Sequence, residues 1–185
     1  MKAIRSILLT LLIAPALAAL AGEGPDWPAM DDALQPTPHQ RVAGQPEPHE
    51  LAALAHAGVK HVVNARSEGE LEAWNEPRLL DELGMTYHHL PIAGAEDLDR
   101  QAVARFDAIL NEIGDEPALL HCASGNRIGA LFALRAAWID GEDSEAAIEI
   151  GRAHGLTRLE GAVRQKLGEQ RSVANTPDQD CAENC

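Results

Sequence analysis

The segment from residue 121 to residue 129, His-Cys-Ala-Ser-Gly-Asn-Arg-Ile-Gly, has the residue types and the spacing that nucleophilic chemistry needs. Cys122 leaves a short apolar run, and four small or polar loop residues separate it from Arg127, beyond which a long helix is expected. Backbone N–H groups of such a loop and of a helix N-terminus point at one spot, where the arginine adds a cationic fork. The same field favours the thiolate of Cys122 at neutral pH. The segment therefore predicts attack by sulfur on a phosphorus or sulfur centre that carries an oxyanion.

In this interpretation Cys122 is the nucleophile, and Arg127 holds two substrate oxygens and stabilises the charge of the transition state. The alternative is structural, because a cysteine at a strand end is also a common small buried hydrophobic residue. For Ser124, a hydrogen bond to the sulfur and a local bond to the loop backbone are both open. The predicted substrate-binding set is the loop itself: Ala123, Ser124, Gly125, Asn126 and Arg127.

A phosphatase also needs an acid that protonates the leaving group. Strand geometry then indicates which residues support the nucleophile. Asp97 is the first candidate for this catalytic role and Asp99 the second, although an Asp just before a helix is also a common N-cap. His121 precedes the nucleophile in a strand, so its side chain points to the opposite face and we expect a buried supporting role. Arg66 either extends the anion site or is a solvated turn residue.

The two ends of the chain differ from its middle. Residues 1–21 have a charged start, an apolar centre and small residues at their end, which is typical of a secretory signal. The apolar stretch is shorter than the ~20 residues that a membrane anchor needs. We therefore expect an exported, periplasmic or secreted protein with no membrane span after cleavage. An extended arm over 22–37, a domain over 38–170 and a disordered tail over 171–185 complete the predicted organisation.

The tail contains Cys181 and Cys185, and export would place them in an oxidising compartment. We expect these two cysteines to pair and to leave Cys122 free. One alternative links a tail cysteine to Cys122 as a redox lock, and metal binding by the tail is a weaker one. The adjacent His88 and His89 point to opposite faces of a strand and cannot share a metal, so we expect neither a metal nor a cofactor.

The formal net charge of −14 limits the partners of the chain. Nucleic acids and anionic membranes are polyanions, and a strongly acidic protein repels both. A small phosphorylated or sulfur-bearing anionic substrate is compatible with this charge, because the local field at the loop opposes the global repulsion. The oligomeric state is left open.

Hydrophobic patterning predicts an α/β protein. The expected elements alternate along the chain, with strands over 41–46, 59–64, 85–90 and 118–121 and helices over 49–57, 77–83, 99–113, 128–139, 144–154 and 159–167. This alternation predicts a single domain with a largely parallel central sheet flanked by helices, with 41–46 as an edge strand closed by Pro46. Ligands bind at the carboxyl ends of such strands, so we expect 64–66, 92–97 and 122–127 to converge.

Four segments carry a resemblance to a known family: residues 41–46, 62–66, 89–92 and 121–129. Over roughly residues 38–140 the chain resembles the cysteine-dependent protein tyrosine and dual-specificity phosphatase superfamily. Within it, the chain is most similar to the phosphatase-like domain of bacterial beta-lactamase hydrolase-like proteins. The resemblance implies a protein tyrosine phosphatase-like fold, a phosphocysteine intermediate on Cys122 and a phosphate cradle around Arg127.

Two features depart from the superfamily pattern. Four residues rather than five separate Cys122 from Arg127, and Ile128 replaces the Ser or Thr that usually follows the arginine. The shorter loop resembles that of single-domain rhodaneses, so a sulfurtransferase that works through a persulfide is the alternative function. A non-catalytic oxyanion-binding module is the third hypothesis. The prediction is an exported cysteine-dependent phosphatase that hydrolyses a phosphomonoester.

Overall fold

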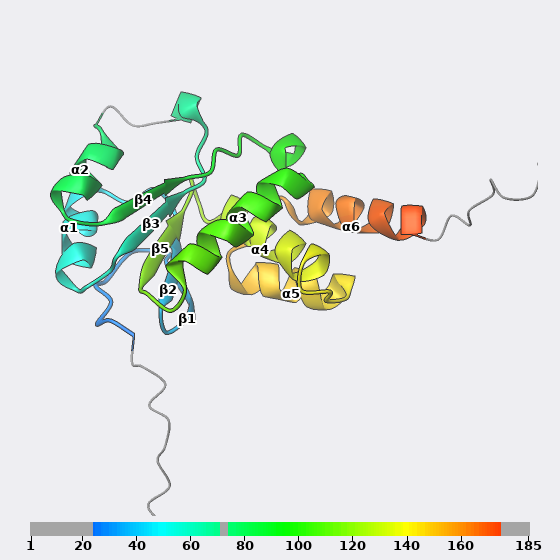
Figure 1. Ribbon diagram of the computed structural model, residues 1–185, viewed down its shortest axis with the longest axis horizontal. Coiled ribbons are helices and arrows are strands. Elements are labelled where there is room, and N and C mark those ends of the chain that lie inside the picture. Colours follow the sequence, from blue (N-terminus) through cyan, green and yellow to red (C-terminus); the bar gives the residue numbers. More distant parts are fainter. Residues whose placement is uncertain (1–23, 71–73, 175–185) are drawn as a thin grey trace, which may run out of the picture.

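The computed structural model describes residues 24–70 and 74–174 (Figure 1). The expected signal over residues 1–21 lies outside the described residues, and so do Cys181 and Cys185, whose pairing stays a prediction. Within the described part of the chain, no helix is both long enough and apolar enough to cross a membrane.

Five short strands form one sheet in the order β1-β2-β5-β3-β4. Neighbouring strands run parallel except for β1, which pairs antiparallel with β2. The arrangement confirms the predicted single α/β domain with a largely parallel sheet. The strands are β1 (Leu34–Thr37), β2 (Gln40–Ala43), β3 (His61–Asn64), β4 (Thr86–His89) and β5 (Ala118–His121).

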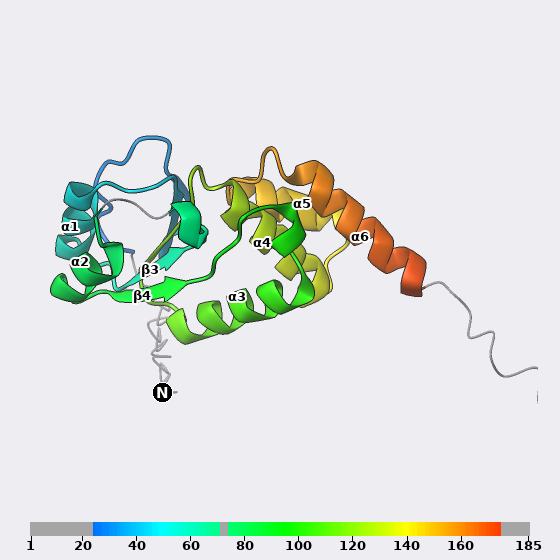
Figure 2. The ribbon, with the colours of Figure 1, turned by 90° about the horizontal axis from the view of Figure 1, so that it is seen from above.

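Helices cover both faces of this sheet (Figures 1 and 2). Every residue of the central strands β3 and β5 is therefore buried, which explains the adjacent apolar residues Val62–Val63 and Ala118–Leu120 at their centres. Helices α1 (Pro48–His56) and α2 (Glu76–Glu82) pack on one face through a core that includes Leu51, Leu80 and Leu119. The larger core on the other face belongs to α3 (Arg100–Ile113), α4 (Asn126–Trp138), α5 (Ser144–Ala153) and α6 (Glu160–Ala174).

Two expectations about the ends of the domain are wrong. The strand β2 is not an edge strand, because β1 pairs with it from within the segment 22–37, where no strand is expected. Pro36 obscures β1 in the sequence, yet a proline is tolerated on an edge strand, where its missing N–H leaves no neighbour unpaired. At the other end α6 continues to Ala174, four residues beyond the expected domain end at 170.

Candidate active site

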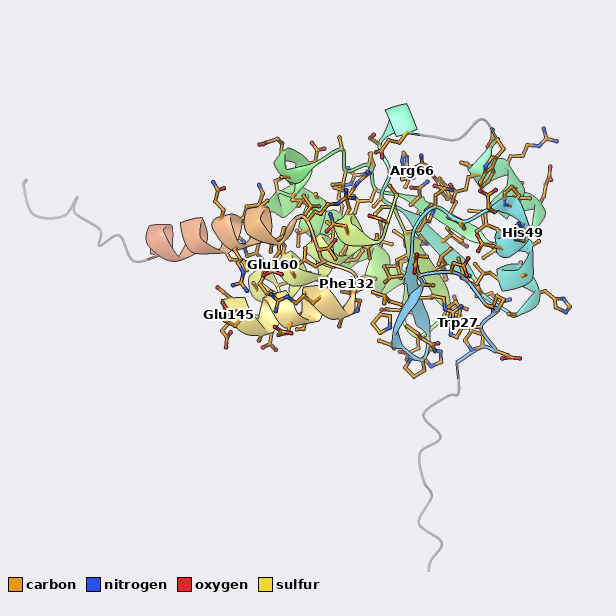
Figure 3. The ribbon with its side chains drawn as sticks, turned by 180° about the vertical axis from the view of Figure 1, so that it is seen from behind. Trp27, His49, Arg66, Phe132, Glu145 and Glu160 are labelled. Carbon is orange, nitrogen blue, oxygen red and sulfur yellow. The ribbon has the colours of Figure 1, made fainter. Side chains whose placement is uncertain are left out.

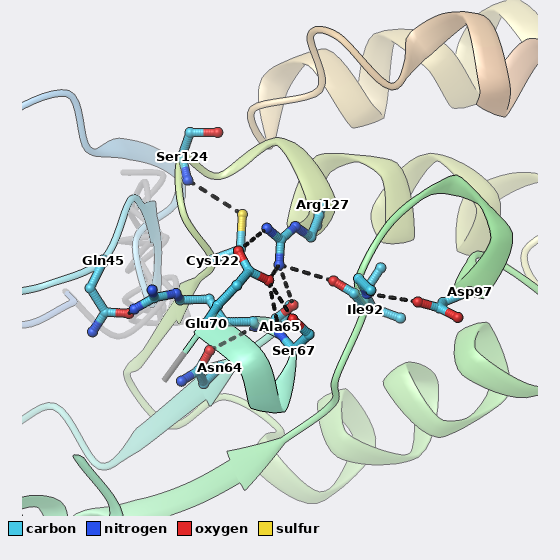
Figure 4. Close-up of polar contacts among 12 residues, drawn as sticks. Gln45, Asn64, Ala65, Ser67, Glu70, Ile92, Asp97, Cys122, Ser124 and Arg127 are labelled. Atoms are coloured by element: carbon cyan, nitrogen blue, oxygen red, sulfur yellow. Dashed lines mark hydrogen bonds and ion pairs between the residues drawn. The ribbon is translucent and has the colours of Figure 1, made fainter. Parts of the chain in front are cut away.

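Cys122 lies directly after β5, at the carboxyl edge of the sheet, and is 1% exposed. Its backbone N–H donates to Ala43 O at 3.5 Å, at the end of the neighbouring strand β2. The backbone N–H of Ser124 points back at the sulfur, with 3.5 Å between N and Sγ. Figure 4 shows the Ser124 hydroxyl directed away from the sulfur, so the main chain of this residue, rather than its side chain, contacts the candidate nucleophile.

The loop closes over the sulfur because Gly125 adopts a left-handed conformation, with φ of 77°. A side chain at this position would be strained, and its Cβ would come within 3.3 Å of Val42 Cγ1. Gly125 is also the residue from which α4 starts, and its C=O accepts the N–H of Gly129 at 3.0 Å. The helix therefore begins at Asn126, earlier than predicted, and Arg127 lies in its first turn.

Arg127 connects three segments that are far apart in the sequence (Figure 4). Its Nη1 donates to Ile92 O at 2.9 Å, to Ala65 O at 3.2 Å and to Glu70 Oε2 at 2.7 Å, while Nη2 donates to Glu70 Oε1 at 2.6 Å. Ala65 follows β3, Ile92 follows β4 and Arg127 follows β5. The structure thus brings the three strand-end segments together, with the guanidinium at their junction.

These contacts leave one edge of the guanidinium for a ligand. A guanidinium has five N–H donors in a planar fork, and the bonds above use both donors of Nη1 and one of Nη2. Among the described residues, no hydrogen bond uses the Nε–H of Arg127 or its second Nη2 donor. Two parallel N–H groups on one edge match two oxygens of a phosphate or a similar oxyanion.

Glu70, which the sequence analysis missed, fixes the opposite edge of this guanidinium. It ends the short helical turn η1 (Glu68–Glu70), and it also accepts hydrogen bonds from the backbone N–H and hydroxyl of Ser67. The hydrogen bond from Arg127 is the largest cause that lowers the pKa of Glu70 to about 2, and the same bond raises the pKa of Arg127. The spacing Ser-x-x-Glu signals a helical turn, but nothing in it indicates contact with residue 127.

A buried polar network lies on the other side of the sheet from Cys122. His121 is 0% exposed, and its Nε2 lies 2.8 Å from Oε1 of Glu76, the first residue of α2. Glu76 Oε2 also accepts hydrogen bonds from Asn64 Nδ2 at 3.0 Å and from Gln45 Nε2 at 3.4 Å. His121 contacts the α2 side of the sheet, while Cys122 belongs to the core on the α4 side. The network joins the residue before Cys122 to three other segments.

Arg66 is not the solvated turn residue that the sequence permits. It is 9% exposed, its Nη1 donates to Gln45 Oε1 at 2.5 Å, and its backbone N–H donates to Asn64 Oδ1 at 2.8 Å. Its backbone oxygen lies 2.9 Å from His89 Nε2. These bonds fix the strand-end segment 64–66 beside the candidate site.

The Asn126 side chain binds the connection between α5 and α6 through its amide oxygen. Its Oδ1 accepts hydrogen bonds from Thr157 N at 2.8 Å, from Thr157 Oγ1 at 3.2 Å and from Leu159 N at 3.3 Å. The amide oxygen of Asn126 therefore fixes the connection between α5 and α6 to the Cys122 loop. The place of Asn126 in the substrate-binding loop stays a prediction.

The two candidate acids cap local structure. Asp97 Oδ2 accepts the backbone N–H of Ala93 at 2.7 Å, within its own loop, and Figure 4 shows Asp97 beyond Ile92 as seen from Arg127. Asp99 is the N-cap of α3 and accepts the N–H of Ala102 at 2.8 Å. Within the described part of the chain, neither carboxylate has a hydrogen bond to Cys122 or Arg127. The sequence pattern predicts the capping interactions.

The described residues contain no group of three or more His, Cys, Asp or Glu side chains that could hold a metal ion. The described residues at the site supply a buried thiol, an arginine with one edge open to a ligand and the backbone N–H groups of the loop.

The largely parallel five-stranded sheet, with a loop and helix α4 after its central strand β5, has a protein tyrosine phosphatase-like fold. Residues 32–139 match the family model of the phosphatase-like domain of beta-lactamase hydrolase-like proteins. The chain belongs to this family, as its sequence resemblance suggests. The match covers all five strands and α1 to α4.

Curated relatives and solved structures agree with this placement. The beta-lactamase hydrolase-like protein of Xylella fastidiosa (strain Temecula1) is 32% identical over 124 residues, which are 62% of this chain and 27% of the relative. The Agrobacterium fabrum protein of the same description is 29% identical over 120 residues, with the same shares covered. The chain thus matches about a quarter of the length of these relatives.

Among solved structures, a Neisseria meningitidis protein described as a candidate phosphatase is 25% identical with a TM-score of 0.60, over 75% of this chain and 97% of the other. TpbA of P. aeruginosa, solved in complex with phosphotyrosine, is 19% identical with a TM-score of 0.52, over 80% of this chain and 96% of the other. The second likeness shows the fold alone. Together with the family match, the comparisons support a phosphatase as the general class of this protein.

Proposed function

We propose that this protein is an exported cysteine-dependent phosphatase that hydrolyses a phosphomonoester through a phosphocysteine intermediate. The observation that supports this proposal is the orientation of Arg127. Glu70 and Ile92 hold one side of its guanidinium, and the edge with Nε and Nη2 is left for a ligand beside the Cys122 loop. An edge with two N–H donors binds two phosphate oxygens, and the field of the loop favours the thiolate. Residues 1–21 support export.

The reaction proceeds in two steps. The Cys122 thiolate attacks phosphorus, the S–P bond forms, and the bond from phosphorus to the leaving oxygen breaks. The leaving oxygen takes a proton from an acid, for which we propose Asp97. Water then attacks the phosphocysteine and passes a proton to the Asp97 carboxylate, the S–P bond breaks, and inorganic phosphate leaves with the thiolate and the acid both restored. In both steps Arg127 stabilises the charge on the equatorial oxygens.

Asp97 would donate this proton after a local change in its loop. The loop is tied to the site at one end, where Ile92 O accepts from Arg127, and the Asp97 carboxylate is held by Ala93 N. Release of that one hydrogen bond frees the carboxylate without disturbing the contact between Ile92 and Arg127. Substrate binding at Arg127 and acid placement are thus linked through one loop.

The first test is turnover by the reduced protein and by Cys122→Ser, with an aryl phosphate in one arm and thiosulfate with cyanide in the other. We expect phosphate release that the variant loses. Thiocyanate formation without phosphate release would instead assign the protein to the sulfurtransferases. No turnover in either arm would contradict both enzymes and leave the oxyanion-binding module.

A second test identifies the acid. Asp97→Asn should slow hydrolysis of an alkyl phosphate much more than that of p-nitrophenyl phosphate, whose leaving group needs little protonation. Asp99→Asn is the matched control, because asparagine preserves the N-cap of α3. A selective loss in Asp99→Asn would transfer the role to Asp99.

Export is tested by fractionation of cells that produce the full chain, where retention in the cytoplasm contradicts it.

A further inference from the structure

A second polar cleft lies beside the candidate site, between the loop that carries Asp97 and helix α6. The cleft has a volume of about 200 Å³ and is lined by Ala95, Glu96, Ala162, Gln165 and Lys166. Ala95 and Glu96 belong to the short helical turn η2 (Ala95–Asp97), which lies beside the first turns of α6 in both ribbon views (Figures 1 and 2).

Both walls of the cleft are anchored on two consecutive residues of the catalytic loop and its helix. The η2 wall is fixed through Ile92, whose C=O accepts from Arg127 at 2.9 Å. The α6 wall is fixed through Thr157 and Leu159, whose N–H groups donate to Asn126 Oδ1 at 2.8 and 3.3 Å. Because residues 126 and 127 are adjacent, both walls of the cleft are tied to the same short stretch of chain that follows Cys122.

The cations on the outer side of α5 and α6 are already neutralised. Arg152 pairs with Glu149 and Glu160, and Arg164 pairs with Glu145 and Glu160, at N···O separations of 2.5 to 2.9 Å. Figure 3 shows Glu145 and Glu160 over these two helices, away from Arg66. These arginines stabilise the packing of α5 and α6 rather than a ligand.

Two other cations, Lys166 and Arg158, have no partner among the described residues. Lys166 lines it, and Arg158 lies in the turn between Thr157 and Leu159, the two residues held by Asn126. Among the described residues, neither Lys166 nor Arg158 has a hydrogen bond or an ion pair from its side chain. In a chain with a net charge of −14, Lys166 in the cleft and Arg158 beside the residues held by Asn126 are two local positive charges on the α6 side of the anion site.

We propose that this cleft binds a second anionic group of the substrate, so that the enzyme prefers phosphomonoesters that carry a further phosphate or carboxylate. The inference rests on the proposed phosphatase function, since it assumes that the first phosphate binds at Arg127. Lys166 contacts the second anion inside the cleft, and Arg158 attracts it at the end nearer the catalytic loop. The pair also offsets the repulsion that the acidic chain exerts on an anionic substrate.

Glu96 sets the selectivity of the cleft. It lines the same space as Lys166 but forms no ion pair with it within the described structure, so both charges face a ligand. A carboxylate at this position weakens the binding of any anion, and its removal should therefore strengthen it. Variants of Glu96 and Lys166 must change affinity in opposite directions, which a merely structural role would not produce.

Binding to the Cys122→Ser protein separates this inference from turnover. Titration calorimetry at low salt would compare hexyl phosphate with hexane-1,6-diyl bisphosphate, which differ by one terminal phosphate. We expect tighter binding of the bisphosphate. Lys166→Gln and Arg158→Gln should each weaken it about threefold to fivefold, the range of one exposed ion pair, and leave hexyl phosphate unchanged. Glu96→Gln should tighten it.

Lys60→Gln is the matched control. It removes one exposed cation just before β3, at the opposite edge of the sheet, and should change neither affinity. Equal affinity for the two ligands, or equal effects of Lys166→Gln and Lys60→Gln, would overturn the inference. If the unsubstituted protein releases no phosphate from an aryl phosphate while the Cys122→Ser variant still prefers the bisphosphate, the proposed phosphatase function fails and the two-anion site stands.

Discussion

Glu70 holds Arg127 through two hydrogen bonds of 2.6 and 2.7 Å on the edge formed by Nη1 and Nη2. The carboxylate is not in the way of a substrate, because the edge formed by Nε and Nη2 stays open. It fixes the rotation of the guanidinium before any ligand arrives. An arginine oriented in advance loses less conformational entropy when it binds an oxyanion.

Glu70→Gln should make stability less dependent on pH. The pKa of Glu70 is lowered in the folded state to about 2 from an ordinary value of 4.5. A lowered pKa contributes stability that is present above pH 4.5 and is lost as the pH falls toward 2. We expect a contribution of about 1 kcal/mol for this partly exposed pair. Urea unfolding between pH 6 and pH 2.5 measures it, with Glu142→Gln as control. An unchanged acid slope would contradict the interpretation.

The same variant should lower kcat for an aryl phosphate about tenfold at pH 7, because the amide has only one accepting oxygen and no charge, so the two parallel bonds to Nη1 and Nη2 are lost. The loss is expected to be smaller than that from removal of a transition-state donor, which costs about 10²–10³. An increase in kcat would show that Glu70 competes with the substrate instead of orienting Arg127.

Asn126→Ala should reduce both stability and activity. The substitution leaves the N–H groups of Thr157 and Leu159 without their acceptor and costs about 2–3 kcal/mol. It also frees the α5–α6 connection from the catalytic loop, so kcat should fall in parallel. Asn126→Asp keeps the accepting oxygen and should restore most of the melting temperature. Equal losses in both variants would show that the acceptor is not what matters.

Gly125→Ala tests the turn that closes the loop. The left-handed φ of 77° and a Cβ only 3.3 Å from Val42 Cγ1 predict a loss of stability of about 1–3 kcal/mol, together with loss of turnover. Gly58→Ala is the matched control, because its φ is 94° and a Cβ there meets nothing within 4 Å. We expect Gly58→Ala to lose stability only. Chemical unfolding and an aryl phosphate assay on both variants distinguish backbone strain from damage to the site.

The sequence predicts most of the sheet for a physical reason. Adjacent apolar residues, as in Val62–Val63 and Ala118–Leu120, point to opposite faces of a strand and so predict a sheet that is buried on both faces. Glycines at 58, 84 and 114 mark the ends of the preceding helices. The rule that ligands bind at the carboxyl ends of parallel strands then places residues 64–66, 92–97 and 122–127 together. The strand β1 escapes prediction because prolines interrupt its pattern.

The partners of the site residues are harder to predict. His121 and Glu76 are 45 positions apart, and Arg127 and Glu70 are 57 apart. A polar residue in a turn or in the first turn of a helix has many possible roles in sequence. The pattern around Asp97 and Asp99 likewise predicts both a cap and an acid, and the structure shows the caps.

The sequence by itself determined the α/β class, the Cys122 loop and the strand ends where a ligand would bind, because these follow from short-range patterns of burial and turning. Only the tertiary structure decided which carboxylate holds Arg127, which side chain anchors the α5–α6 connection and which cations stay unpaired. These choices depend on contacts between residues tens of positions apart. Such contacts arise when helices pack on a sheet, and local propensity does not encode them.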